Sequence, residues 1–143
     1  SLMQFTVSSN AKLIAKQVGK KGKELSDSVK RALLITGQVG LTIIEDRTAK
    51  GEQINGQDFA PYSEEYTWFR AKNGRSVSNV DLQFTGKMLA SMSVKANSSY
   101  ATIFFTRAAE AKKAAMNNKT RPFFGFSRGE EERLGKVFFR YLK

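Results

Sequence analysis

The sequence contains no cysteine and no histidine among its 143 residues. Without cysteine there are no disulfides, no thiolate metal sites and no cysteine nucleophile, a composition that fits a reducing compartment. Without histidine the chain lacks the usual general base and the commonest transition-metal ligand. An enzyme built from it would have to use paired carboxylates, a lysine base or a hard metal held by oxygen ligands. We therefore expect a protein that is not an enzyme and that carries no cofactor.

Long apolar runs are also missing. No stretch approaches the roughly 18 apolar residues that cross a bilayer, so we expect no membrane partner. The first residues lack the apolar segment of a signal peptide, and Ser1-Leu2 before Met3 resemble an expression scar. The composition, 41% hydrophobic and 11% aromatic, is typical of a folded protein. The length predicts a single domain over residues 1–143, in which residues 50–80 form a long, partly mobile loop region.

The net charge is +11, which favours a nucleic-acid partner. The excess of lysine and arginine is divided between residues 1–31 and 76–143 and forms no dense tract. A solvated face or an acidic protein partner explains such a distribution as well. The alternative function that this charge supports is a basic nucleic-acid-binding module. Its candidate contacts are Lys20, Lys21, Lys23, Lys112 and Lys113.

A long helix is predicted over residues 23–49. One face carries Leu25, Val29, Leu33, Thr36, Gly40, Ile43 and Arg47, and apolar residues also occur on other sides. Such a helix is about 40 Å long, whereas a domain of this size has a radius of gyration of about 14–15 Å. The helix must bend at Gly37 and Gly40, or project and be covered by another subunit. Glycine inside a helix costs about 0.5–1 kcal/mol, which indicates close packing or a kink at these positions.

The remaining pattern predicts an α+β fold, with the long N-terminal helix packed on a small antiparallel β-sheet and followed by a C-terminal helix. Short apolar alternation predicts strands at residues 4–7, 91–95 and 100–106, the last two joined by a hairpin turn at 97–99. Further helices are expected at residues 11–18, from Ser63, and at 108–116, ended by Asn117-Asn118.

An aromatic connector, Arg121-Pro122-Phe123-Phe124-Gly125-Phe126-Ser127, precedes the last helix. Ser127 and Glu130 fit the capping-box spacing, so a helix should begin here, with Leu134, Val137, Phe138, Tyr141 and Leu142 on its apolar face. An extended connector would alternate its phenylalanines between two faces. Both faces would then need cover, from the core or from a partner.

No catalytic motif emerges from the acidic or glycine-rich segments. Neighbouring carboxylates such as Glu64-Glu65 do not face the same way on a helix, and Gly86-Lys87 lacks the rest of a phosphate-binding loop. Aromatic residues 62–69 beside Arg70 could stack on bases, although such spacing is more often core or protein interface. The third-ranked function, an enzyme, would use Asp58, Glu64 or Asp81.

Taken in order, several blocks of this sequence resemble the phage virion morphogenesis family, the tail-completion or head–tail joining proteins of tailed bacteriophages. The resemblance covers about residues 25–143 and begins with Arg47 and Gly51. The matching positions that we take as interface or structural motif residues are Asn55, Gly56, Phe59, Pro61, Tyr62, Thr85, Gly86, Arg121, Pro122, Phe123, Phe124 and Gly125. The family's histidine-glycine element is absent, and residues 108–113 stand in its place.

The resemblance implies a structural virion protein with no catalytic residues. It would act in the tail or neck of the virion, and in the host cytoplasm during assembly. Its expected partners are further copies of itself, as a ring or other homo-oligomer, and tail-tube, tail-terminator or head-connector proteins. We expect a homo-oligomer in virions and a dimer or a monomer when the protein is purified alone; a strict monomer at high concentration, with no ring in any phage particle, would count against this.

Overall fold

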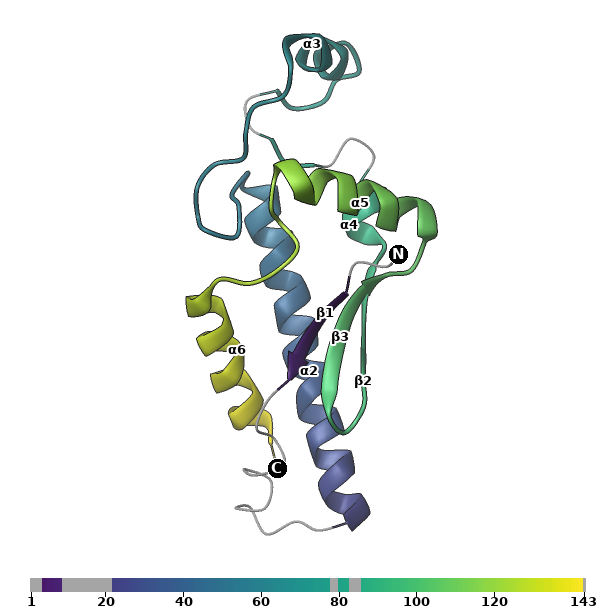
Figure 1. Cartoon of the computed structure of the whole chain (residues 1–143), viewed down its shortest axis with the longest axis vertical. Helices are drawn as coiled ribbons and strands as arrows, with labels where there is room; N and C mark the ends of the chain where they lie inside the picture. Colours follow the sequence, from purple (N-terminus) through teal and green to yellow (C-terminus); the bar gives the residue numbers. More distant parts are fainter. Residues whose placement is uncertain (1–3, 9–21, 78–79, 83–85, 143) are drawn as a thin grey trace.

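The computed structural model describes residues 4–8, 22–77, 80–82 and 86–142 (Figure 1). Several predictions concern residues outside these ranges: the helix at 11–18, Lys20 and Lys21 of the basic loop, and Thr85 of the motif set. Among the described residues no helix is both long and apolar enough to span a membrane.

The sheet has three antiparallel strands, β1 (Gln4–Ser8), β2 (Met92–Ala96) and β3 (Tyr100–Phe105), in the order β1-β3-β2. The turn between β2 and β3 is fixed by Asn97, whose Oδ1 accepts hydrogen bonds from the backbone N–H groups of Ser99 and Tyr100. Asparagine favours such turns because its side chain can replace a backbone acceptor. The predicted hairpin and the predicted first strand are both confirmed.

Helix α2 (Gly22–Ala49) is continuous over 28 residues, about 42 Å at 1.5 Å per residue, and lies along the sheet (Figure 1). Its predicted buried face is confirmed from Val29 to Arg47, although Leu25 is only half-buried. The glycines allow close packing. A Cβ built on Gly37 would lie 2.5 Å from Cγ1 of Val94 on β2, and one on Gly40 would lie 2.8 Å from Cζ of Phe126.

Helix α6 (Arg128–Tyr141) packs against α2 (Figure 1). Its Leu134 and Phe138 are buried, and so is Leu142 just after the helix. Tyr141 was predicted to share this apolar face, and that prediction is wrong, because 44% of the residue is exposed. The described core therefore lies between α2, the sheet and α6 and extends to residues 88–89, 111–114 and 123–126, and the predicted α+β architecture is confirmed.

Helix α5 (Ala108–Thr120) follows the sheet, beside the short α4 (Lys87–Ala90). We expected α5 to end at Met116, and it instead continues for four residues through the two asparagines. Asn117 donates its Nδ2–H to the carbonyl of Lys113 in the preceding turn, and Asn118 accepts hydrogen bonds from the following connector. Because both side chains have partners compatible with helix, they do not compete with the helical backbone as they do at a turn.

Helix α3 (Glu64–Lys72) stands apart from the rest of the molecule, at one end of its long axis (Figure 1). Ser63 caps it by accepting a hydrogen bond from the N–H of Tyr66 at 3.2 Å. The helix predicted to open at Ser63 is thus confirmed. It lies inside the region 50–80 that we expected to be mainly loop.

Candidate interface: an exposed arm and the junction that supports it

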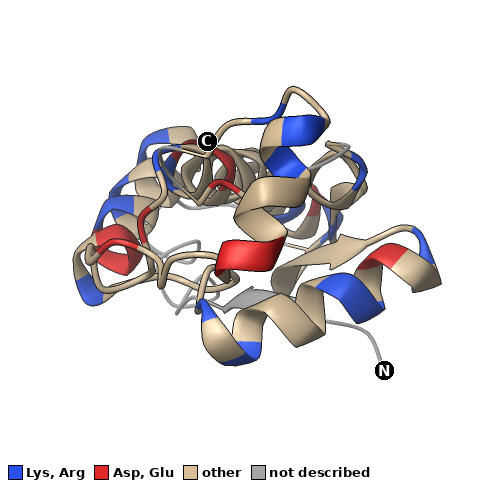
Figure 2. Cartoon of the chain, turned by 90° about the horizontal axis from the view of Figure 1, so that it is seen from above, with Lys and Arg blue, Asp and Glu red and all other residues tan. Residues whose placement is uncertain are grey.

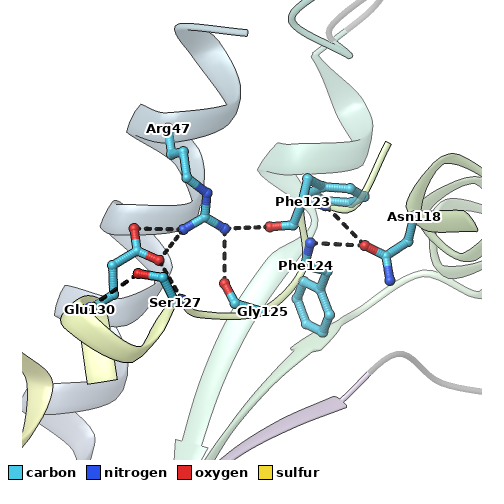
Figure 3. Close-up of polar contacts among 7 residues, drawn as sticks. All are labelled: Arg47, Asn118, Phe123, Phe124, Gly125, Ser127 and Glu130. Carbon is cyan, nitrogen blue, oxygen red and sulfur yellow. Dashed lines mark hydrogen bonds and ion pairs between the residues drawn. The ribbon is translucent and has the colours of Figure 1, made fainter. Parts of the chain in front are cut away.

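Arg47, on the last turn of α2, is the centre of a buried polar junction (Figure 3). Its Nη1 donates to both carboxylate oxygens of Glu130, at 2.6 and 2.7 Å. Its Nη2 donates to the carbonyls of Phe123 and Gly125, at 2.7 and 2.8 Å. The side chain of Arg47 is only 7% exposed, so these charge-assisted bonds lie largely away from water. We call Arg47, Phe123, Gly125, Ser127 and Glu130 the Arg47 junction.

Glu130 has two functions in this junction. Besides binding Arg47, its Oε1 accepts the backbone N–H of Ser127 at 2.9 Å, while Ser127 Oγ accepts the N–H of Glu130 at 3.2 Å. This reciprocal pair is the predicted capping box, and it satisfies two donors that a helix start otherwise leaves free. One carboxylate therefore fixes the start of α6 and ties it to the end of α2.

The aromatic connector is irregular, and all three of its phenylalanines are buried. Asn118 Oδ1 accepts the N–H groups of both Phe123 and Phe124 at 3.0 Å (Figure 3). The ring of Phe124 lies 5.1 Å from that of Phe105 on β3, and Phe126 covers Gly40 of α2. The cover that we expected from the core or from a partner is supplied by this chain's own core.

The Asn55-Gly56 block forms a tight turn packed against this connector. Gly56 has φ +85°, a conformation that glycine adopts without strain, and Asn55 Oδ1 accepts the N–H of Gln57. Just before the turn, the N–H of Ile54 bonds the carbonyl of Pro122 at 3.0 Å, and a Cβ on Gly125 would meet the Ile54 side chain at 2.9 Å. Two motif blocks more than 60 residues apart in the sequence thus touch.

Arg121 joins the same connector to the start of a projecting segment. Its guanidinium donates to the carbonyls of Ala60 and Pro61, at 2.8 and 2.9 Å, and lies 5.1 Å from the ring centre of Tyr62. Phe59, just before, is buried and donates its N–H to Gly51. The motif residues from 59 to 62 and the connector therefore form one structural unit.

Tyr62 closes the base of the projecting segment. Its hydroxyl accepts the N–H of Leu82 at 3.3 Å, so residues 62 and 82 meet although 19 residues lie between them. We call residues 62–77 and 80–82 the arm. Burial raises the pKa of Tyr62, and the positive charge of Arg70 opposes that rise. Two cations contact the Tyr62 ring: the Arg70 guanidinium is 4.8 Å from its centre, and the Arg121 guanidinium of the connector is 5.1 Å from it.

Arg70 holds the arm together from inside. It is 1% exposed, and its Nε donates to the carbonyl of Ser76 at 2.9 Å while Nη2 pairs with Asp81 at 3.2 Å. A buried arginine with several fixed partners restricts the chain around it. The arm is thus a defined structural element, anchored by Tyr62 and Arg121.

The outer surface of the arm exposes three large apolar side chains. Trp68 is 65% exposed, Phe69 45% and Val77 47%, and all three belong to this short segment. Trp68 carries the Lys72 ammonium 5.1 Å from its ring centre, and Phe69 stacks on Tyr66. Large exposed aromatic residues gathered on one element are typical of a protein interface.

Of the residues named for the other two functions, those that the structure describes are not assembled into a site. Lys23 begins α2 at one end of the molecule, whereas Lys112 and Lys113 lie on α5 towards the other end (Figure 1). Lysine and arginine are spread over several helices (Figure 2). Of the proposed catalytic acids, Asp81 pairs with Arg70, and among the described residues no group of three or more acidic side chains is placed to bind a metal.

The roles of Arg47, Asn118 and Arg70 were not predicted. Arg47 was placed on the buried face of α2, and an arginine on an apolar face is a signal for a buried ion pair. Its partner could not be identified, because Glu130 is 83 residues away in the sequence.

Gly86, a motif residue, has φ +77° and caps the short α4 beneath the arm.

The fold and site define an α+β protein with an anchored arm that exposes large apolar side chains. No family model matches the sequence, and neither a curated protein nor a solved structure matches it.

Proposed function

We propose that this chain is a structural component of a phage virion, a tail-completion or head–tail joining protein that acts by self-assembly and protein–protein contacts. Its partners would be further copies of itself and tail-tube, tail-terminator or head-connector proteins. It would act in the tail or neck of the particle, after assembly in the host cytoplasm. The ordered sequence blocks from Arg47 to Ser127 support this proposal by their resemblance to the virion morphogenesis family.

The observation that carries the proposal is the exposure of Trp68 and Phe69 on an arm with a fixed base. An exposed tryptophan on a mobile loop would lose conformational freedom on binding, which weakens association. Here Arg70, Tyr62 and Arg121 already hold the arm in place, so less of that cost remains. Tryptophan is also the residue type most enriched among interface positions that dominate binding energy.

The motif residues support the arm indirectly. Those that the structure describes lie in the aromatic connector, in the turn at Asn55-Gly56, or at the base of the arm. Their contribution would be to hold the core and the arm in one geometry, while Trp68 and Phe69 make the contacts with neighbouring subunits. Through this division, a chain that we expect to lack catalytic groups would perform a specific function.

Deletion and complementation in the phage or prophage that carries the gene test this function. Without the protein, electron microscopy should show filled heads and separate tails that fail to join. Wild-type protein supplied in trans should restore joined particles, as should Met116→Ala, which removes an exposed apolar side chain from α5. Trp68→Ala should not restore them. Normal joined particles in the complete absence of the protein would refute the proposal.

A further inference from the structure

A cavity of about 540 Å³ lies at the base of the arm, on the side where the arm faces α5. Its lining includes the rings of Tyr62 and Tyr66, the side chain of Met88, and three cationic residues, Arg70, Lys113 and Arg121. Cavities of about 300–1,000 Å³ with mostly apolar walls and a few polar groups are typical binding sites. None of the residues of the Arg47 junction lines this cavity.

Two buried polar atoms on the residues lining this cavity have no hydrogen-bond partner, Nη1 of Arg70 and Oε2 of Glu110. Glu110 is 5% exposed, and only its other oxygen is paired, with Lys113 at 3.2 Å. An unsatisfied buried polar atom costs about 1–3 kcal/mol, more if charged. A ligand that supplies a donor for Glu110 and a surface that attracts cations would relieve this cost.

The side chain of Trp68 has both properties. Its indole Nε1–H is a donor without acceptor function, suited to a carboxylate oxygen. Its ring face attracts cations within about 6 Å, and tryptophan is the best of the aromatic residues in this respect. The residues that line the cavity include two accessible cations, Lys113 and Arg121, two tyrosines, and Glu110, whose Oε2 is unpaired. The sequence contains a single tryptophan, and it is the most exposed aromatic side chain among the described residues.

Trp68 cannot fill the cavity of its own subunit, because it lies on the other side of α3. Tyr66 and Arg70, which line the cavity, are four residues apart and share one face of the helix. Trp68 lies two residues from each, about half a turn away. Each chain thus carries the projecting Trp68 on one side of α3 and the cavity on the other. Two copies can then bind through two different surfaces, which is a heterologous contact. Head-to-tail contacts of this kind close into rings when the rotation between subunits permits.

The charges around the two surfaces are complementary as well. Glu64, four residues before Trp68, lies on the same face of α3, and both Glu64 and Glu65 are exposed. The cavity residues Lys113, with its side chain 58% exposed, and Arg121 are basic. Lys72, whose ammonium lies 5.1 Å from the Trp68 ring centre, offsets one of these two negative charges. On a chain of net charge +11, the remaining local excess of acid attracts the basic cavity residues of a second copy.

We infer that Trp68 of one copy inserts into the arm-base cavity of the next, with its indole N–H directed at Glu110 and its ring beside Lys113 and Arg121. Glu64 and Glu65 then pair with the basic residues of that cavity. This inference rests on the proposed self-assembly and specifies its partner, a second copy, and its geometry, head to tail.

Fluorescence of the single tryptophan tests the inference, together with mass measured by light scattering on the same samples. As the wild-type protein is concentrated, the emission should shift to shorter wavelength in step with the rise in mass. Lys113→Glu should weaken association at least about tenfold, because it places a negative charge against Glu64 and Glu65. The neighbouring Lys112→Glu, an exposed position that does not line the cavity, should associate like wild type.

A mixing experiment tests the head-to-tail geometry directly. Trp68→Ala keeps the cavity and lacks the projection, whereas Lys113→Glu keeps the projection and has an altered cavity. Each alone should remain monomeric at concentrations where the wild type assembles. When the two variants are mixed, Trp68 of the Lys113→Glu chain can insert into the unaltered cavity of the Trp68→Ala chain. A dimer with shifted emission should therefore appear, and no larger species. Adding Glu64→Lys and Glu65→Lys to Lys113→Glu should restore assembly of that chain by reversing both charges.

The outcomes separate this inference from the proposed function. If mass rises with concentration while the emission stays unchanged, the chain assembles through another surface, and the insertion of Trp68 is refuted. If the mixed variants give no dimer, the head-to-tail contact is refuted. If the wild type stays monomeric at every concentration and the phage particles lack the protein, self-assembly itself is refuted. Circular dichroism of each variant establishes that the fold is intact.

Discussion

Arg47 and Glu130 are 83 residues apart in the sequence, and the guanidinium of one contacts both carboxylate oxygens of the other at 2.6 and 2.7 Å. The same arginine binds two carbonyls of the aromatic connector, and the same carboxylate caps α6. One ion pair therefore couples the end of the long helix, the connector and the last helix. Stability of the fold should depend strongly on it.

Arg47→Ala should lower the free energy of unfolding by about 3–5 kcal/mol, because Glu130 and two carbonyls lose their buried partner. Urea unfolding followed by circular dichroism measures the change. Arg47→Lys should recover part of the loss, since one ammonium cannot reproduce the planar contact with several acceptors. Arg31→Ala, an exposed position on the same helix, is the control and should change stability by less than about 0.5 kcal/mol. Equal stability of Arg47→Ala and Arg31→Ala would contradict the role of the junction.

Gly37→Ala should destabilise the protein although alanine favours helices. The added Cβ would lie 2.5 Å from Cγ1 of Val94, a short and stiff side chain that cannot move aside freely. Overpacking of this kind costs about 1–3 kcal/mol. Gly135→Ala on α6 is the matched control, since nothing lies within 4 Å of its Cβ, and it should stabilise by about 0.5–1 kcal/mol. Stabilisation by both substitutions would show that α2 and β2 are not in close contact at Gly37.

Phe123→Ala should lower the free energy of unfolding by about 3–5 kcal/mol, because the ring is completely buried. Phe124→Ala should also destabilise, since its ring packs on Phe105. Phe139→Ala removes the same side chain from a position that is 48% exposed, so it should stay within about 0.5 kcal/mol of wild type. Thermal and urea unfolding of the three variants compare them. Wild-type folding and assembly of both Phe123→Ala and Phe124→Ala would mean that the connector has no structural role.

Glu45 should make stability depend on pH in a defined direction. Burial, and next the charge of Asp46, raises its pKa above the ordinary value of 4.5. The folded protein therefore binds this proton more tightly than the unfolded chain, and the resulting stability is lost as the pH rises through the raised pKa. Glu45→Gln should increase the free energy of unfolding at neutral pH, with the gain disappearing by about pH 3. A gain that stays constant over this range would show that titration of Glu45 is not its cause.

Salt dependence distinguishes self-assembly from nucleic-acid binding. A protein that neutralises six to ten phosphates loses about 10³–10⁵ in DNA affinity between 50 and 200 mM salt. We expect only weak binding of duplex DNA without that slope, measured by fluorescence anisotropy. Self-association should persist at 200 mM salt, because burial of apolar side chains such as Trp68 and Phe69 is not screened. Tight, steeply salt-dependent DNA binding by a chain that never self-associates would favour the basic nucleic-acid-binding module instead.

Local signals in the sequence were sufficient for most of the described secondary structure. The capping box at Ser127 and Glu130, the cap at Ser63 and the turn at Asn97 all act within a few residues, so their partners are adjacent in the sequence. The extension of α5 was missed because the side chain of Asn118 is satisfied by Phe123 and Phe124 beyond the helix. Asparagine ends or continues a helix according to such contacts, and these become known only when the fold is known.

The site was less predictable for the same reason. Arg121 and Tyr62 were both among the motif residues, yet their contact spans nearly 60 residues and has no signature in either block. The cavity combines the arm with α5, and the unpaired oxygen of Glu110 is visible only after folding. Trp68 gave no indication of exposure in the sequence, because an aromatic residue at helical spacing is usually part of the core.

Light scattering of the purified chain over a wide concentration range tests the central claim, that the arm drives self-assembly, most directly. The wild type and Met116→Ala should rise in mass from the 16.0 kDa of one chain towards a discrete oligomer. Trp68→Ala should remain a monomer in the same range, because loss of a dominant interface residue weakens association by about thirtyfold or more. A wild type that stays at the mass of one chain at the highest concentrations, or a Trp68→Ala variant that assembles as well as the wild type, would contradict this account.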